Sequence, residues 1–498
     1  MAISFNNIPT TVRTPGVYNE IDNSRALQGL VDVPHTALII GQKHSSGTAA
    51  FDTLQAITND NLANGYFGNG AMLSRMCNVF KANNPNTELF AIAIGSGIGG
   101  VAASATINFS AALSTNTASG TGTYYLLING NQQYVDIISN MSGAEIASVV
   151  KSTINGDSTL PVVASFTAGT VFFSAVNSGT QGNYIDIRAN YYVGQSTAKV
   201  FSVEPTIVSM AGGTTDPDLG DAWAVIADRQ FHYIIQPYID AANLTEIETE
   251  LADRFKPLED LQGHGFTAVK ATQASCTTLG NSRNSPHNTI LGVNNGPNAP
   301  EEWAAAIGAQ AAFNLNQDPA RPLTGLKLIN ILPPTSTDRF DRSERDILLY
   351  DGIATYTVDT GGNVQIERCI TTYQTNSAGL PDPSYLDVQT LATLEAIRYQ
   401  YKLRMTNRFI VPRFKLADDT FQVQPGQKIV QPKTIKLEII SLMTQLANVK
   451  GWVENIEDFV KNLIVERNAS DRNRVDVLLP PDLVNQFRIL ASLIQFVL

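Results

Sequence analysis

Thr36-Ala-Leu-Ile-Ile-Gly41 is a short apolar run of the kind that forms a buried β-strand. A helical pattern follows near Ala71–Ala82, and a second apolar run, Glu88-Leu-Phe-Ala-Ile-Ala-Ile94, comes directly after it. The order strand, helix, strand predicts parallel strands in a sheet that is covered on both faces. This stretch therefore predicts an α/β fold.

The same pattern resumes further along the chain. Asp216 or Thr215 can cap a helix that runs to Asp228, because short polar side chains accept hydrogen bonds from the first turn. Later predicted strands are Phe231–Gln236, Gly265–Lys270 and Thr289–Val293, and later predicted helices are Leu244–Phe255 and Glu301–Asn314. Residues 36–95 and 206–330 are therefore predicted to form one α/β domain.

The composition changes between these two segments. Only eight of the residues 96–205 are charged, while Ser, Thr, Asn and Gly are abundant. Short runs such as Thr123-Tyr-Tyr-Leu-Leu-Ile-Asn-Gly130 and Thr170-Val-Phe-Phe-Ser174 alternate with turn residues, which is typical of short strands. We therefore expect 96–205 to be a β-rich domain inserted into the α/β domain.

A Pro-rich linker, Asn330-Ile-Leu-Pro-Pro-Thr335, separates a last predicted domain, residues 336–485. Residues 353–370 predict a hairpin around the turn Asp359-Thr-Gly-Gly-Asn363. A long amphipathic helix follows, which Asp387 can cap and which runs to about Ile410. We expect this domain to be α+β.

The two ends of the chain predict extended arms. Residues 1–35 hold no helical period, and residues 486–498 read as an apolar strand. A solvated strand edge invites pairing with another chain, although burial of the last strand in its own domain is the alternative. The candidate pairing residues are Thr14, Pro15, Gly16, Val17 and Tyr18 at the start, and Phe487, Ile489, Leu490, Leu493, Ile494 and Phe496 at the end.

The sequence offers no credible catalytic constellation. Gly95-Ser-Gly97-Ile-Gly-Gly100 matches GxGxxG, but no acidic residue occurs between Glu88 and Asp136, so we interpret it as a flexible exit into the insertion. P-loop, GxSxG and HExxH motifs are absent from the sequence. The five histidines share no ligand spacing, and the three cysteines are far apart. We expect no enzymatic activity, no cofactor and no metal.

Composition narrows the class of protein further. The 498 residues leave room for about three domains, and 43% of them are apolar. A net charge of −11 argues against a general nucleic-acid binder. The N-terminus lacks the basic start and apolar run of a signal peptide, and no apolar stretch reaches 18 residues. We therefore expect synthesis in a reducing cytoplasm and no membrane insertion.

One region has the opposite charge. Residues 395–450 hold ten basic and four acidic side chains, which gives +6 in a chain of −11. This pattern indicates a basic surface that faces an acidic protein partner, while a solvated helix face is the alternative interpretation. The candidate residues are Arg398, Lys402, Arg404, Arg408 and Arg413.

Four motifs, in their order and spacing, resemble the contractile tail sheath proteins of phages, and most closely the Mu-like sheaths. They are Thr14-Pro15-Gly16-Val17-Tyr18, Ala211-Gly212-Gly213-Thr214-Thr215-Asp216-Pro217, Asp318-Pro319-Ala320-Arg321-Pro322-Leu323 and the ending Leu478–Phe496. The resemblance covers nearly the whole chain, and the insertion is its loosest part.

The resemblance implies a non-enzymatic subunit of a virion tail that is assembled in the bacterial host cytoplasm. Subunits of such sheaths form hexameric rings stacked around an inner tail tube protein, with baseplate and tail terminator proteins as further partners. Terminal arms join neighbouring subunits, the C-terminal domain lies nearest the tube, and inserted domains lie outside. Contraction drives the tube through the target cell envelope. The five basic candidates then become candidates for contact with the tube.

Two other classes of protein stay open from the sequence alone. One is a nucleotide-binding α/β enzyme that uses the glycine run at residues 95–100. The other is a static filament or surface protein. A polymer that occurs in two states of different lattice length is a contractile sheath, whereas a static filament has one.

Overall fold

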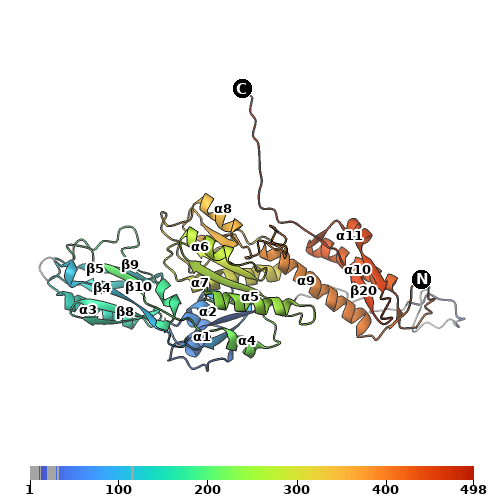
Figure 1. Cartoon of the computed structure of the whole chain (residues 1–498), viewed down its shortest axis with the longest axis horizontal. Coiled ribbons are helices and arrows are strands. Elements are labelled where there is room, and N and C mark those ends of the chain that lie inside the picture. The colour runs from blue at the N-terminus through green and yellow to red at the C-terminus, as the bar shows by residue number, and fades with distance from the viewer. Residues whose placement is uncertain (1–10, 12, 20–29, 31–32, 114–116, 498) are drawn as a thin grey trace. The chain divides into compact units, whose positions relative to one another are not determined.

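The computed structural model describes residues 11, 13–19, 30, 33–113 and 117–497 (Figure 1). Contacts divide the chain into two compact units. The larger, which we call the body unit, comprises Pro34–Gln317 and Arg321–Leu391. The smaller, which we call the C-terminal unit, comprises Ala392–Leu498, Asp318–Ala320 and the described residues before Pro34.

An eight-stranded sheet lies at the centre of the body unit, in the order β15-β14-β13-β12-β11-β1-β3-β2. The inner strands from β14 to β3 are parallel, and β15 and β2 pair antiparallel at the two edges. The α/β class predicted from the sequence is confirmed. The strands are β1 Thr36–Gln42, β2 Leu54–Ile57, β3 Glu88–Ile94, β11 Tyr233–Ile235, β12 His264–Lys270, β13 Asn288–Val293, β14 Ile353–Val358 and β15 Val364–Arg368.

Helices pack on both faces of this sheet. A Cβ atom at Gly265 would lie 2.9 Å from Ile247 of α5, whereas a Cβ at Gly308 of α7 would lie 2.6 Å from Ile235 and 3.6 Å from Phe266. Because neighbouring residues in a strand point to opposite faces, α5 and α7 cover opposite faces. The helices are α1 Asp60–Phe67, α2 Met72–Asn83, α4 Gly220–Ile226, α5 Ala241–Phe255, α6 Gln273–Asn281, α7 Pro300–Gln317 and α8 Arg342–Tyr350.

The expected cap of α4 is wrong. The helix begins at Gly220 with Leu219 at its N-cap. Asp216 instead accepts hydrogen bonds from the backbone N–H (2.7 Å) and the hydroxyl of Thr180. Thr215 has a φ of 60°, which lies in the left-handed region. These two residues therefore connect the body to the segment 102–211 rather than starting a helix.

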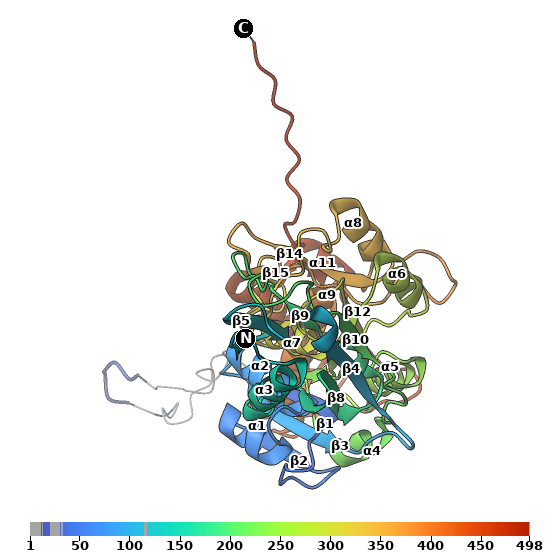
Figure 2. The same cartoon turned by 90° about the vertical axis from the view of Figure 1, so that its left-hand side faces the viewer.

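The segment 102–211 builds two further sheets, β10-β4-β8-β7 and β6-β5-β9. Figure 2 looks from the side on which β4, β8 and α3 lie. The two sheets and α3 share an apolar core that includes Phe109, Tyr124, Val150 and Phe173. The elements are β4 Ala102–Asn108, β5 Gly122–Ile128, β6 Asn131–Ile137, α3 Gly143–Gly156, β7 Val162–Thr167, β8 Thr170–Ser178, β9 Ile187–Ala189 and β10 Ile207–Ala211. We call this segment the insertion.

The hairpin at residues 353–370 belongs to the body unit and not to the C-terminal domain predicted to span 336–485. β14 pairs in parallel with β13 through Ile353 and Ala354, and both residues are fully buried. The division between the units falls between Leu391 and Ala392. The sequence pattern of a hairpin is the same whichever sheet it joins, so the linker at residues 330–335 was a misleading boundary.

The C-terminal unit is α+β, as predicted. The helix α9, Val388–Met405, continues from the body unit into it and ends in a π-helical turn over Thr406–Ile410. Ile439, Leu442 and Phe459 belong to its apolar core. Its other elements are α10 Pro432–Gln445, α11 Ile456–Asn462 and the strand pairs β16 Lys415–Leu416 with β17 Ile429–Val430, β18 Val453–Glu454 with β21 Asp482–Leu483, and β19 Ile464–Arg467 with β20 Val475–Leu478.

Four histidines of the body unit are held in surroundings that disfavour their charged form. His35 and His232 stack with ring centroids 4.2 Å apart, and His264 and His287 are buried. Burial lowers the pKa of His35 and His287 to about 4 and that of His232 and His264 to about 3. A histidine in the unfolded chain takes up a proton near pH 6.5. The unfolded state therefore binds more protons than the folded state between pH 6.5 and about 4.

We predict that the body unit loses stability as the pH falls from 7 to 5. Each buried histidine contributes up to about 2 kcal/mol of this loss at pH 5. Denaturant unfolding of dispersed subunits at the two pH values measures it. His232→Gln should reduce the loss. An unfolding free energy that is the same at both pH values would contradict the prediction.

Candidate assembly surfaces

The end of the chain leaves the C-terminal unit as an extended segment. Its last anchor is β21, which pairs with β18, and the backbone N–H of Val484 donates to the carbonyl of Trp452 at 3.1 Å. Residues 484–497 then form neither helix nor strand (Figure 1). The strand expected over 486–498 is therefore not formed within the single chain, because a strand needs a second edge to pair with. Leu498 lies outside the described residues.

The extended segment is strongly apolar and exposed. Phe487, Ile489 and Leu493 are 78%, 85% and 85% exposed, and Leu490, Ile494 and Phe496 are similarly exposed. Burial of this segment inside its own domain is thus not what the structure shows. A contiguous exposed apolar run of this kind marks an association surface. We call residues 484–497 the C-terminal arm.

Only part of the predicted N-terminal arm is described. Thr14, Pro15, Gly16, Val17 and Tyr18 are all exposed, and Val17 is 89% exposed. The Tyr18 hydroxyl donates to the carbonyl of Thr14 at 3.2 Å, a bond within the segment itself. The remainder of residues 1–35 lies largely outside the described residues.

Open strand edges are the second feature that bears on association. Each of the strand pairs in the C-terminal unit has two strands, so within the described residues both of its edges lack a third strand. The β19–β20 pair has the longest register, from Ile464 opposite Leu478 to Arg467 opposite Val475. Ile464 is 49% exposed and Leu478 is 58% exposed. This hairpin can therefore accept a strand from another chain.

The structure divides the five basic candidates. Arg404 of α9 is not a surface residue, because its guanidinium donates to Glu438 at 2.9 Å and to Gln445 at 2.6 Å, and its side chain is only 10% exposed. It joins α9 to α10. Arg408 also approaches Glu438, at 3.7 Å, but its side chain is 39% exposed.

The other three candidates differ in exposure. Lys402 is exposed and Arg398 is half-buried on α9. Arg413 is exposed in a turn with a φ of 61°. The pairing of β16 with β17 brings Lys428 beside Lys415, since the backbone N–H of Lys415 donates to the carbonyl of Lys428 at 2.8 Å. Sequence reasoning missed this pair as a cluster, although both lie within the basic stretch.

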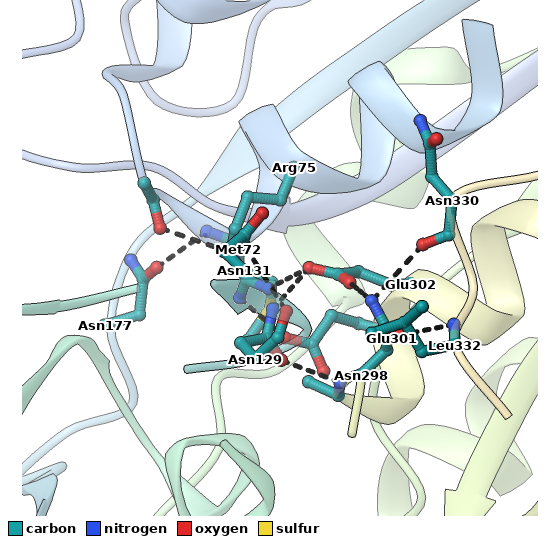
Figure 3. Close-up of polar contacts among 12 residues, drawn as sticks. Met72, Arg75, Asn129, Asn131, Asn177, Asn298, Glu301, Glu302, Asn330 and Leu332 are labelled. Atoms are coloured by element: carbon teal, nitrogen blue, oxygen red, sulfur yellow. Dashed lines mark hydrogen bonds and ion pairs between the residues drawn. The ribbon is translucent and has the colours of Figure 1, made fainter. Parts of the chain in front are cut away.

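A buried ionic cluster joins the insertion to the body (Figure 3). The guanidinium of Arg75 on α2 contacts Glu302 at 2.5 Å and Glu301 at 2.7 Å, and both carboxylates lie in the first turn of α7. Asn129, at the end of β5, donates to Glu302 at 2.6 Å and accepts from the backbone N–H of Ala299 at 2.8 Å. We call these residues, with Asn298, the junction cluster.

Burial has opposite effects on the two kinds of charge in the junction cluster. It raises the pKa of Glu301, and Arg75 opposes this rise. Burial by itself would lower the pKa of Arg75, but Glu301 and Glu302 raise it above its ordinary value. The dipole of α7 further favours carboxylates in its first turn. Asn298 completes the cluster by donating to Glu302 at 2.7 Å and accepting from the backbone N–H of Leu332 at 2.8 Å.

Gly97 and Gly100 of the glycine run at residues 95–100 pack against the chain that leaves the insertion. A Cβ atom at Gly97 would lie 2.6 Å from the carbonyl oxygens of Thr215 and Asp216. The glycine thus allows the chain entering the insertion to pass close to the chain leaving it. Carbonyl oxygens this close to Gly97 would repel a phosphate, which disfavours the nucleotide-binding interpretation of the run.

The described residues contain no group of three or more His, Cys, Asp or Glu side chains arranged to hold a metal ion. In the same part of the chain, no helix combines the length and apolar character that a membrane span requires. The exposed C-terminal arm and the open strand edges are surfaces suited to association with other chains. These surfaces are typical of a protein that associates with other chains.

Comparison with known proteins identifies the family. The phage tail sheath protein central domain matches residues 212–372, and the phage tail sheath C-terminal domain matches residues 381–497. The Mu-like prophage FluMu tail sheath protein of Haemophilus influenzae is 37% identical over 498 residues, which is 100% of each chain. The chain belongs to the phage tail sheath family.

Solved structures resemble the chain in outline. The sheath tail protein of Desulfitobacterium hafniense has a TM-score of 0.47 and 11% identity, over 94% of this chain and 100% of that one. The sheath of an extracellular contractile injection system in its contracted state has a TM-score of 0.48 and 9% identity, over 98% of both chains. The family assignment rests on the sequence matches.

We predict that Asn129→Gly destabilises the body unit by about 1–3 kcal/mol, because Glu302 and the N–H of Ala299 lose a buried partner. Glycine accepts the positive φ of 49° at this position, so the change isolates the side chain. Asn140→Gly is the matched control, since Asn140 also has a positive φ (69°) but is exposed. Thermal and denaturant unfolding measure the difference. Equal effects of the two substitutions would contradict a stabilising role of the junction cluster.

Proposed function

We propose that copies of this chain polymerise as hexameric rings stacked helically around an inner tail tube protein. Contraction of this sheath then drives the tube through the target cell envelope. The full-length similarity to a Mu-like prophage sheath supports the proposal. The observation that carries it is the C-terminal arm, which exposes large apolar side chains that have no function in a single chain.

The arm stabilises the polymer by pairing with a neighbour. Burying one large apolar side chain contributes roughly 1.5–3 kcal/mol, and each ladder hydrogen bond contributes about 1 kcal/mol. The open edges of the β19–β20 hairpin are suitable acceptors, because Ile464 and Leu478 offer apolar contacts beside unpaired backbone. The N-terminal arm is proposed to join neighbours in the same way.

Contraction is proposed to be a rigid rotation of subunits while the arms keep the lattice connected. The extended sheath is then a kinetically trapped assembly whose energy is released through new contacts between subunits. No nucleotide enters this scheme. We propose that the protein has no catalytic role, which agrees with the packing of the glycine run against Thr215 and Asp216.

A sheath must hold its tube in register and release it on firing. A polar, salt-sensitive contact meets both needs better than a large apolar one. We propose that the C-terminal unit faces the tube with Arg398, Lys402, Arg408 and Arg413, while Arg404 is bound within its own unit. The insertion is proposed to lie on the outside.

The remaining partners follow from the same proposal. Baseplate and tail terminator proteins meet the two ends of the sheath, and assembly takes place in the host cytoplasm before the tail is complete. Neither direct nucleic-acid binding nor membrane insertion is part of the scheme.

We predict that deleting residues 486–498 leaves a folded subunit that does not polymerise. The joint between subunits loses its apolar burial and ladder bonds, while the cores of both units are unchanged. Electron microscopy of the purified protein detects tubes, and circular dichroism checks the fold. If polymers of the parent chain occur in two states of different lattice length, the polymer is a contractile sheath and not a static filament.

A pair of substitutions gives the matched control for this deletion. Ile489→Ser with Leu493→Ser should weaken polymerisation, whereas Ser492→Ala with Gln495→Ala, in the same segment, should not. Normal tubes from the deleted chain would exclude the arm as the joint. A deleted chain that does not fold would mean that the arm serves its own domain.

We predict that Arg398→Glu with Lys402→Glu weakens co-assembly with the tube while sheath-only polymers still form. Lys402→Glu is a surface change of the kind that usually alters stability by less than about 0.5 kcal/mol, and circular dichroism checks the fold of the double variant because Arg398 is half-buried. Lys461→Glu with Arg474→Glu is the control, because both side chains are well exposed in the same unit. Co-sedimentation with tubes over a range of salt concentrations measures the contact. Wrapping equal to that of the parent at physiological salt would place the tube contact elsewhere.

A further inference from the structure

The strand β7 is the outer strand of a sheet. The order β10-β4-β8-β7 leaves one side of β7 without a strand in the described part of the chain. Its sequence, Val162-Val-Ala-Ser-Phe-Thr167, contains no charge and no proline. Edge strands are usually protected by such residues, because an unprotected edge pairs with other chains. β7 therefore needs another form of protection.

Asn155, in the last turn of α3, supplies it. Its side-chain amide donates to the carbonyl of Ala164 at 2.8 Å, and its carbonyl oxygen accepts from the N–H of Ala164 at 2.8 Å. The side chain thus makes the two hydrogen bonds that a neighbouring strand would make. The N–H and C=O of one residue point to the same side of a strand, so Ala164 is the centre of the open edge, between Val162 and Phe166.

The surroundings of this edge favour pairing once the edge is open. On the outer face of the sheet, Val163 is 52% exposed and Phe172 is 43% exposed. The register places Phe172 opposite Ser165 and Val163 opposite Ser174, so all four side chains lie on this face. None of them is charged, so two copies of the face do not repel each other. A second strand laid along β7 would gain both backbone bonds and apolar contact.

We propose that Asn155 closes the β7 edge against pairing with the β7 strand of a second copy of this chain. The inference rests on the proposed function in one respect, because a sheath concentrates many copies of the insertion in one lattice. In such a lattice the arms must find their acceptor edges while other edges stay unpaired. Asn155 makes this selection by occupying the backbone groups at the centre of the competing edge.

The test uses the full chain at a concentration at which the parent sediments as a single dispersed species. Asn155→Ala should give dimers and larger species, with an average mass at least about twice that of the parent. Ser152→Ala, one turn earlier in α3, should sediment as the parent does, since Ser152 bonds only to its own helix at Ser148. Sedimentation of Asn155→Ala as the parent species would overturn the proposal.

Two further variants separate an open edge from a loss of fold. Val163→Lys places a charge beside the open edge, so Asn155→Ala with Val163→Lys should return to the parent species. Asn155→Asp keeps the acceptor and adds a charge, so it should remain dispersed. Association of either variant at the level of Asn155→Ala would overturn the proposal, because destabilisation would then be the cause.

These outcomes do not depend on tube formation. If the proposed sheath function fails, the parent chain forms no tubes in electron micrographs at any concentration. If the edge proposal fails, the parent forms tubes and Asn155→Ala sediments like Ser152→Ala. The two failures are therefore distinguished by different measurements on the same preparation.

Discussion

Charge burial at the start of α7 is the constraint on which the body unit depends. Glu301 and Glu302 are 1% and 5% exposed, and an ion removed from water costs several kcal/mol unless it is fully paired. The partners come from α2 through Arg75, from the insertion through Asn129 and from the loop before α7 through Asn298. Because every partner must be in place, the cluster fixes the relative positions of these segments within the body unit.

Much of the fold is readable from the sequence where burial leaves a simple pattern. β1 and β3 are covered on both faces, so their apolar runs are continuous and their predicted bounds agree closely with the structure. The helix α3 was not predicted, because its capping box at Ser142 and Glu145 lies among the polar residues that suggested turns. The hairpin at 353–370 was placed in the wrong unit, since strand pairing between distant segments has no local signal.

The sequence also predicts some features of the candidate surfaces and not others. An apolar terminal segment is recognisable from its composition, so the sequence predicts an arm, but it leaves open whether that arm is buried in its own domain or pairs with another chain. The selection among basic residues was not predictable. Arg404 and Lys402 are two residues apart on one helix, yet only a tertiary contact with Glu438 and Gln445 shows that Arg404 is internal. Asn129 was missed because asparagine is common in hairpin turns, so its presence there does not indicate a buried hydrogen bond.

The length of the C-terminal arm has a mechanical consequence. At about 3.3 Å per residue, the 14 residues 484–497 span roughly 45 Å when extended. In the proposed sheath, two subunits that the arm links can shift and turn against each other within its reach while their folded cores carry no strain. When the arm is pulled along the direction of β21, the ladder bonds between β21 and β18 lie across the force. These bonds share the load instead of breaking one after another, so the anchor resists tension better than its two-residue length suggests.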